Sequence, residues 1–229
     1  MTVSSLELLR MEAQLPRQYL ALVKSIGATG NINKLLDQYE FLARRYFERR
    51  RRHHTLTHIA HCLIEFDRVA QQAKNPHAVL MAIFYHDVIC DTTRDDNEEK
   101  SALYFTTIAH NILGITDEAL IAETVRLIHL SKKHCPDETD IDGALFSDID
   151  MSILGADAPE YDEYALLVRQ EYPQYSDSEW ARLRMEYFID PLLAQKSIYH
   201  TAVFRASHEE YARANLMEER VRLQSQPVN

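Results

Sequence analysis

The chain has 229 residues, of which 46% are hydrophobic and 26% are charged, with a formal net charge of −10. This composition is typical of a globular protein with a buried core, and the negative charge argues against a nucleic-acid polymer as partner. No apolar run approaches the roughly 20 residues that span a bilayer, so we expect no membrane. Three cysteines without CxxC spacing and an acidic N-terminal stretch favour a cytoplasmic protein.

The pattern of apolar residues favours helices throughout. Only 5 glycines are present, which leaves few positions for the tight turns of many short strands. We therefore expect an all-α fold, a helical bundle, with residues 1–229 as a single domain, whereas the oligomeric state stays open. The expected helices, in chain order, cover Ser5 to Ile26, Ile32 to Phe47, His54 to Gln72, Pro76 to Cys90, Asn97 to Leu113, Asp117 to Leu130, Asp142 to Leu154, Pro159 to Tyr172, Asp177 to Leu193 and Ser207 to Leu223.

The segment RRRHHTLTHIAH opens the third expected helix. On one face of a helix, His54 and His58 stand four residues apart, and His61 follows three residues later, so two imidazoles could converge on one centre. Such pairs are more often structural or merely exposed. Arg52, the last of four consecutive arginines, is a candidate clamp for phosphate oxygens, although a run of this kind is more often a solvated face.

The fourth expected helix is apolar nearly all round until it reaches His86 and Asp87. A buried carboxylate is costly there unless a cation or hydrogen bonds receive it, and the plain alternative is that Asp87 ends the helix near the surface. Neighbours on a helix point about 100° apart. Both side chains can therefore address one site if the ions lie across that edge of the helix, as in a dinuclear centre. The acidic stretch that follows is expected to cap the next helix through Asp96 or Asn97.

Further candidates lie in the second half of the chain. The segment SKKH, near the end of the sixth expected helix, contains Lys133 and His134. Cations at this end are stabilised by the helix dipole and need no other role. His129 is expected in the core. Asp148 and Asp150 stand just inside the next segment, where an unpaired carboxylate is costly and where the commoner use of Asp is as an N-cap.

Together these segments resemble the HD-domain superfamily of metal-dependent phosphohydrolases, whose signature is H…HD…D on a helical core, and more closely a branch of predicted phosphohydrolases. The resemblance implies an HD-like core over roughly residues 32–156 with helical extensions at both ends. The matching segments follow one another along most of the chain: RHHTLTHI, FYHDVI, DNEEKSA, SKKH, DIDMSILGA, VRQEY and EEYARANLMEE.

The resemblance also implies a ligand set for a divalent metal. One or two ions would be held by His58, His86, Asp87 and Asp150, with Asp87 as the bridge. Asp150 is favoured over Asp148 because the family's last Asp is followed by an apolar residue and Ser. Mixed nitrogen and oxygen ligands suit Mn, Fe, Co, Ni, Zn or Mg, and the sequence does not choose among them.

The reaction implied is hydrolysis of a small phosphoester, a nucleotide being one class, by metal-activated hydroxide. By similarity to the cyclic nucleotide phosphodiesterases of the same superfamily, His54 is the general acid, and an acid such as Glu98 or Glu99 would keep it protonated. His134 is expected either near a second metal position or facing substrate. The residues expected to contact the small phosphorylated substrate are Arg52, Asn97, Lys133 and His134.

Two other classes of protein fit the same residues. One is a catalytically silent HD-like module that binds a ligand or regulates. The other is a purely structural helical protein, and this alternative predicts no bound metal.

Substrate specificity is expected from a group of aromatic and charged residues whose alternative role is packing: Tyr161, Tyr164, Arg169, Glu171 and Tyr172.

Overall fold

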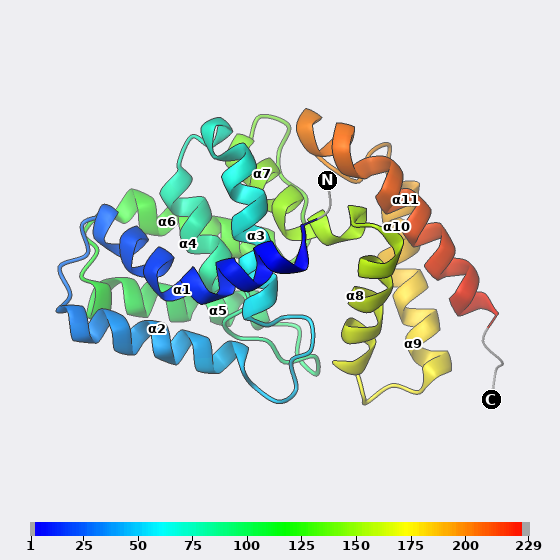
Figure 1. Ribbon diagram of the computed structural model, residues 1–229, viewed down its shortest axis with the longest axis horizontal. Coiled ribbons are helices and arrows are strands. Elements are labelled where there is room, and N and C mark those ends of the chain that lie inside the picture. The colour runs from blue at the N-terminus through cyan, green and yellow to red at the C-terminus, as the bar shows by residue number, and fades with distance from the viewer. Residues whose placement is uncertain (1–2, 226–229) are drawn as a thin grey trace. The chain divides into compact units, whose positions relative to one another are not determined.

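The structure, a computed structural model, describes residues 3–225, and every regular element in that range is helical (Figure 1). This confirms the predicted all-α fold. No helix in the described range is long and apolar enough to cross a membrane. The helices are α1 (Ser5–Ser25), α2 (Ile32–Tyr46), α3 (Leu56–Val69), α4 (Pro76–Tyr85), α5 (Asn97–Ile108), α6 (Glu118–Leu130), α7 (Ile141–Asp150), α8 (Ala158–Gln170), α9 (Asp177–Arg184), α10 (Asp190–Ala194) and α11 (Ala202–Gln224). Short 3-10 or π turns follow four of them, at Ala70–Gln72, Ala109–Leu113, Met151–Gly155 and Met185–Ile189.

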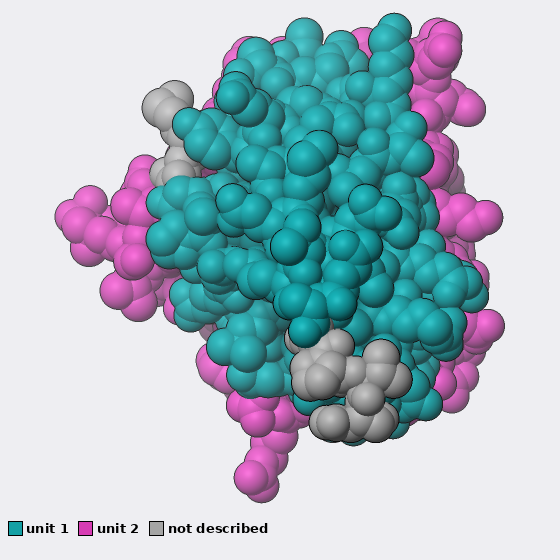
Figure 2. Space-filling view, turned by 90° about the vertical axis from the view of Figure 1, so that its right-hand side faces the viewer, with its two compact units in different colours: residues 1–2, 151–229 teal, residues 3–150 magenta. Residues whose placement is uncertain are grey.

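The chain divides into two compact units, coloured separately in Figure 2. We call residues 3–150 the N-terminal unit and the described residues from 151 onward the C-terminal unit. The N-terminal unit holds α1 to α7, and the C-terminal unit holds α8 to α11. The single domain expected over residues 1–229 stays a prediction.

The core of the N-terminal unit is built around α4. Within this unit α4 packs against α1, α3, α5, α6 and α7, which explains why its sequence is apolar on almost every side. Its last residue, Tyr85, is fully buried and its hydroxyl lies 2.7 Å from the hydroxyl of Tyr19 on α1. Burial on all sides leaves the C-terminal end of α4 as the point where the chain can place polar groups.

Helix α4 ends at Tyr85, so the predicted extension to Cys90 is wrong. After Tyr85, the backbone N–H of Ile89 donates to the hydroxyl of Ser101 at 3.1 Å instead of to a helical carbonyl. The carbonyl of Phe84 accepts a hydrogen bond from the hydroxyl of Tyr46 at 3.0 Å. Tertiary partners thus replace the helical hydrogen bonds, and the chain turns away just where the His86-Asp87 pair begins.

Two further helix boundaries differ from the prediction. Helix α3 begins at Leu56, with Thr55 as its N-cap, because the threonine hydroxyl accepts the backbone N–H two residues later. His54 therefore lies in the turn before α3 and not on its face. Helix α7 ends at Asp150, so Asp148 and Asp150 lie in its last turn and the N-cap alternative for them is wrong.

The C-terminal unit is held together by α11. This helix begins at Ala202, five residues before the predicted start, because the hydroxyl of Thr201 caps it by accepting the N–H of Phe204. It packs against the turn at Met151–Gly155. The approach needs a glycine, since a Cβ at Gly155 would lie 2.5 Å from the Cβ of His208.

A buried ion pair occupies the core of the C-terminal unit. Arg184 Nε donates to Glu219 Oε1 at 3.1 Å, and both side chains are at most 7% exposed. The hydroxyl of Tyr161 donates to the same carboxylate, while Arg184 Nη2 donates to the hydroxyl of Tyr164 at 3.3 Å. The guanidinium lies 3.9 Å from the ring centroid of Phe188. Of the two roles considered for Tyr161 and Tyr164, these contacts support packing.

We expect Arg184→Met to lower the free energy of unfolding of the C-terminal unit by about 3–5 kcal/mol, because it leaves the carboxylate of Glu219 buried without its cation. Trp180, the single tryptophan of the chain, lies in this unit, so its fluorescence in a urea titration follows the unit directly. The control is Arg182→Met, which breaks the exposed pair with Glu186 and should cost no more than about 0.5 kcal/mol. Equal losses for both variants would contradict the prediction.

Candidate metal centre

Four side chains of the N-terminal unit converge on one point. His58 Nε2, from α3, lies 3.2 Å from His86 Nε2 and 3.0 Å from Asp150 Oδ1. His86 Nε2 lies 3.3 Å from Asp150 Oδ1 and 3.2 Å from Asp87 Oδ2. Asp87 Oδ2 lies 3.9 Å from His58 Nε2. The histidine side chains are 2–4% exposed and the carboxylates 12–23%, so the cluster is nearly closed to solvent.

Packing of three helices brings these residues together. Helices α3, α4 and α7 each contact the other two. His86 is the C-cap of α4 and Asp150 is the last residue of α7. A carboxylate at the C-terminal end of a helix faces the negative end of the helix dipole. Asp150 is therefore stable there only with positive charge beside it, which the histidines or a metal ion can supply.

The donor atoms fit a divalent metal ion. An ion bound at about 2.0–2.2 Å by nitrogen and oxygen ligands places neighbouring ligand atoms about 3.0–3.5 Å apart. Four of the separations lie between 3.0 and 3.3 Å, and Asp87 Oδ2 lies 3.9 Å from His58 Nε2. Two imidazoles with two carboxylates are also a ligand set that first-row divalent metals accept.

The backbone of α4 orients the imidazole of His86. Its Nδ1 lies 3.1 Å from the carbonyl oxygen of Ile83 and 3.3 Å from that of Ala82. A carbonyl can only accept, so Nδ1 carries the proton and donates it. In the neutral ring the lone pair is then on Nε2, which faces the cluster. Histidine ligands of metals are commonly held by such a hydrogen bond on the far nitrogen.

The charges of the cluster also call for a cation. Burial disfavours the charged imidazole of His86, but the carboxylates of Asp87 and Asp150 outweigh burial and hold the pKa of His86 well above its usual range. Burial likewise opposes the ionised carboxylates, but the His86 cation outweighs it and keeps the pKa values of Asp87 and Asp150 below their usual range. A bound divalent cation would take the place of that proton.

His54 stands beside the cluster. Its Nε2 lies 4.0 Å from Asp87 Oδ2, and its side chain is 28% exposed. The acids suggested as its partners, Glu98 and Glu99, instead face Lys132, whose Nζ lies 3.8 Å from the first carboxylate and 2.8 Å from the second. The carboxylate beside His54 is therefore that of Asp87.

His134 reaches the cluster from the turn after α6. Its Nε2 lies 2.8 Å from Asp150 Oδ2, the oxygen that is not directed at His58. Its φ of 50° is left-handed, which costs a residue other than glycine roughly 1–2 kcal/mol, and such conformations persist where the surroundings hold them. Asp148 does not share this position, because residues two apart on a helix point about 200° apart.

The other residues expected near substrate lie outside the cluster. The carboxamide of Asn97 binds the backbone of Asp91, accepting its N–H and donating to its carbonyl, each at 3.0 Å. Asn97 thus closes the loop between α4 and α5. Arg52 and Lys133 are exposed. His129 is exposed as well, so its expected place in the core is wrong.

Sequence reasoning missed Cys62, which lies one turn after His58 on α3. Its sulfur is 3.7 Å from Nε2 and 3.8 Å from Nδ1 of His58, and the residue is 1% exposed. The ligand atoms of His58, Cys62 and Asp150 all lie within 4.8 Å of one another. In the sequence, Cys62 stands four residues after His58, a spacing that puts both side chains on the same face of a helix. The sulfur thus lies beside the imidazole, where it forms a wall of the cluster.

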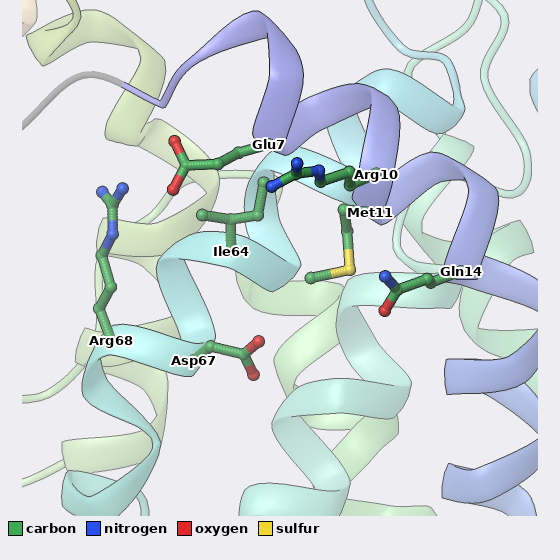
Figure 3. A pocket seen from close by; sticks show the side chains of 7 residues that line it. All are labelled: Glu7, Arg10, Met11, Gln14, Ile64, Asp67 and Arg68. Atoms are coloured by element: carbon green, nitrogen blue, oxygen red, sulfur yellow. The ribbon is translucent and has the colours of Figure 1, made fainter.

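Two cavities of the N-terminal unit lie away from the cluster. One, of about 370 Å³, lies between α1 and α3 (Figure 3) and is lined by Glu7, Arg10, Met11, Gln14, Ile64, Asp67 and Arg68. The other, of about 610 Å³, lies at the N-terminal ends of α4 and α6. Neither is lined by a residue of the cluster, so neither holds a substrate for it.

The cluster thus offers a set of donor atoms suited to a divalent cation, with the imidazole of His54 beside it. No protein-family model, curated protein or solved structure matches the chain. The assignment of a function therefore depends on the residues of the cluster and on their geometry.

Proposed function

We propose that the protein is a metal-dependent phosphohydrolase that cleaves a small phosphoester, a nucleotide being one class, with a divalent cation held by His58, His86, Asp87 and Asp150. The observation that carries the proposal is the convergence of four donor atoms from α3, α7 and the turn after α4, with His54 Nε2 4.0 Å from Asp87 Oδ2. The similarity of the sequence to the H…HD…D pattern of the HD-domain superfamily supports the same assignment.

Each residue has a defined task in this proposal. When bound, the cation lowers the pKa of a water molecule toward neutrality and neutralises charge on the phosphoryl oxygens. His86 offers Nε2 because its Nδ1 is tied to the carbonyl of Ile83, and the carboxylates of Asp87 and Asp150 balance the charge of the ion. His54, when protonated, donates a proton to the leaving oxygen. Its partial exposure allows it to regain that proton from solvent.

Substrate contacts and location complete the proposal. Arg52, Lys133 and His134 are candidates to meet the phosphate of a small substrate, while Asn97 shapes the neighbouring loop. Within the described residues the three cysteines, Cys62, Cys90 and Cys135, form no disulfide, which supports a reducing, cytoplasmic location.

The test combines metal content with turnover. Protein purified without chelator or affinity histidines should contain one or two transition-metal ions per chain by elemental mass spectrometry. It should also hydrolyse members of a panel of aryl and nucleoside phosphate mono- and diesters, lose this activity with chelator and regain it with Mn²⁺, Co²⁺ or Zn²⁺. A wild type that takes up none of Mn, Fe, Co, Ni or Zn would leave only a structural role.

The second candidate is a binding module that holds the metal but does not turn over. The position of Asn97, a predicted substrate contact whose carboxamide binds the backbone of its own loop, favours this alternative. Bound metal without hydrolysis across the whole panel would establish it in place of the hydrolase.

A further inference from the structure

Arg51, in the middle of the arginine run, is a buried cation with no carboxylate partner among the described residues. The residue is 4% exposed and lies in the connection between α2 and α3. Its Nη1 donates to the carbonyl of Asp87 at 2.6 Å and to the carbonyl of His54 at 3.2 Å, and its Nη2 donates to the carbonyl of Val88 at 3.0 Å. The guanidinium lies 4.9 Å from the ring centroid of Tyr46.

This environment is unusual for an arginine. Buried arginines are normally paired with an acid, whereas Arg51 binds three backbone carbonyls, and its Nε is buried without a hydrogen-bond partner within the described structure. A planar guanidinium with donors in fixed directions can join several carbonyls at once, which the single ammonium of a lysine cannot reproduce. Burial and these bonds also leave Arg51 unsuited to gripping a phosphate.

The three carbonyls belong to two segments that no helix holds in place. His54 precedes the first residue of α3, and Asp87 follows the end of α4. One nitrogen of Arg51 contacts the backbone of both residues. The 4.0 Å between His54 Nε2 and Asp87 Oδ2 therefore depends on this guanidinium more directly than on any helical hydrogen bond.

We infer that Arg51 is a positioning residue of the metal centre, which ties the turn carrying the proton donor His54 to the turn carrying the metal ligand Asp87. The inference rests on the proposed function and deepens it. Arg51 touches neither metal nor substrate. It acts by holding two backbone carbonyls so that the side chains of His54 and Asp87 keep their relative position.

The experiment uses Mn²⁺ alone as the probe, because binding of this ion can be followed by the paramagnetic resonance of the free ion. We expect Arg51→Ala to weaken Mn²⁺ binding about 10–100-fold, the usual cost of losing a group that orients a metal ligand. Arg51→Lys should lie between this variant and the wild type. The matched control is Arg49→Ala, from the same run but exposed, which should bind as the wild type does.

Chemical rescue separates positioning from a merely structural role. Methylguanidinium added to Arg51→Ala should restore part of the Mn²⁺ affinity, because it can occupy the space that the side chain leaves, and it should have no effect on the wild type. Circular dichroism and urea unfolding of each variant show whether the fold is retained.

The outcomes are distinct. A folded Arg51→Ala or Arg51→Lys that binds Mn²⁺ as tightly as the wild type overturns the inference and leaves the proposed function standing. Where Arg51→Ala does not fold, Arg51→Lys decides by the same criterion. A wild type that binds neither Mn²⁺, Co²⁺ nor Zn²⁺ overturns the metal centre, and the role of Arg51 with it.

Discussion

Asp150→Asn is expected to lose the divalent cation, while Asp148→Asn keeps it. The substitution preserves the size of the side chain but removes the charge. Asp150 Oδ1 lies 3.0 Å from His58 and 3.3 Å from His86, and its other oxygen lies 2.8 Å from His134. Losing a direct ligand should weaken binding beyond the roughly 10–100-fold that loss of an orienting partner costs, and metal-dependent turnover should disappear with it.

Asp148 is a demanding control for this prediction. It is 1% exposed and stands two residues earlier in the same turn of α7, so its loss affects the same helix end. Isothermal titration with Mn²⁺ or Co²⁺ and elemental analysis of the purified variants give the comparison. Equal loss of metal in the two variants, or retention in both, would show that Asp150 is not the ligand.

His54→Gln is expected to keep the metal but to lower kcat by about 10²–10⁴-fold, the range of a general acid. Glutamine is polar and of similar size but cannot donate a proton as an imidazolium does. His54 Nε2 lies 4.0 Å from Asp87 Oδ2, outside the close contacts of the cluster. The metal affinity of the variant should therefore stay within a few-fold of the wild type.

The leaving group of the substrate makes this prediction sharper. A phosphoester with an alkoxide leaving group needs the proton, so its hydrolysis should show the full loss of kcat. The p-nitrophenolate of a p-nitrophenyl ester leaves readily as an anion, so hydrolysis of that ester should show little loss. Rates for both substrates, measured at saturating metal, provide the test. The same loss on both esters would assign His54 a role other than proton donation, and loss of the ion would assign it to the metal.

Local patterns accounted for most of the helices. The apolar spacing and the breakers were sufficient to place α1, α2, α5 and α6 within a residue or two at their starts. The starts of α3 and α11 were wrong because local threonine caps set them, and the end of α4 was wrong because long-range partners replace helical hydrogen bonds there. Tyr46 binds the carbonyl of Phe84 in the last turn of α4, and Arg51 and Ser101 bind backbone beyond the helix. No local sequence pattern indicates such contacts.

The candidate site shows the same division. His58, the His86-Asp87 pair and an Asp near residue 150 could be selected from residue type, since ionisable groups beside apolar runs need partners. The choice between Asp148 and Asp150 depended on which carboxylate lies beside the histidines, since both side chains are largely buried. The contact between His134 and Asp150 depended on a left-handed backbone that only the surrounding fold maintains.

The sequence by itself determined the helical class and the residue types available to bind a metal, because periodicity and side-chain chemistry are properties of short segments. Only the tertiary structure decided which atoms meet. Arg51 shows this most clearly, since one arginine in a run of four is buried and binds the backbone of His54 and Asp87, while its neighbour Arg52 is exposed. The burial and hydrogen bonding of a residue depend on segments far apart in the chain, so the sequence of one segment does not predict them.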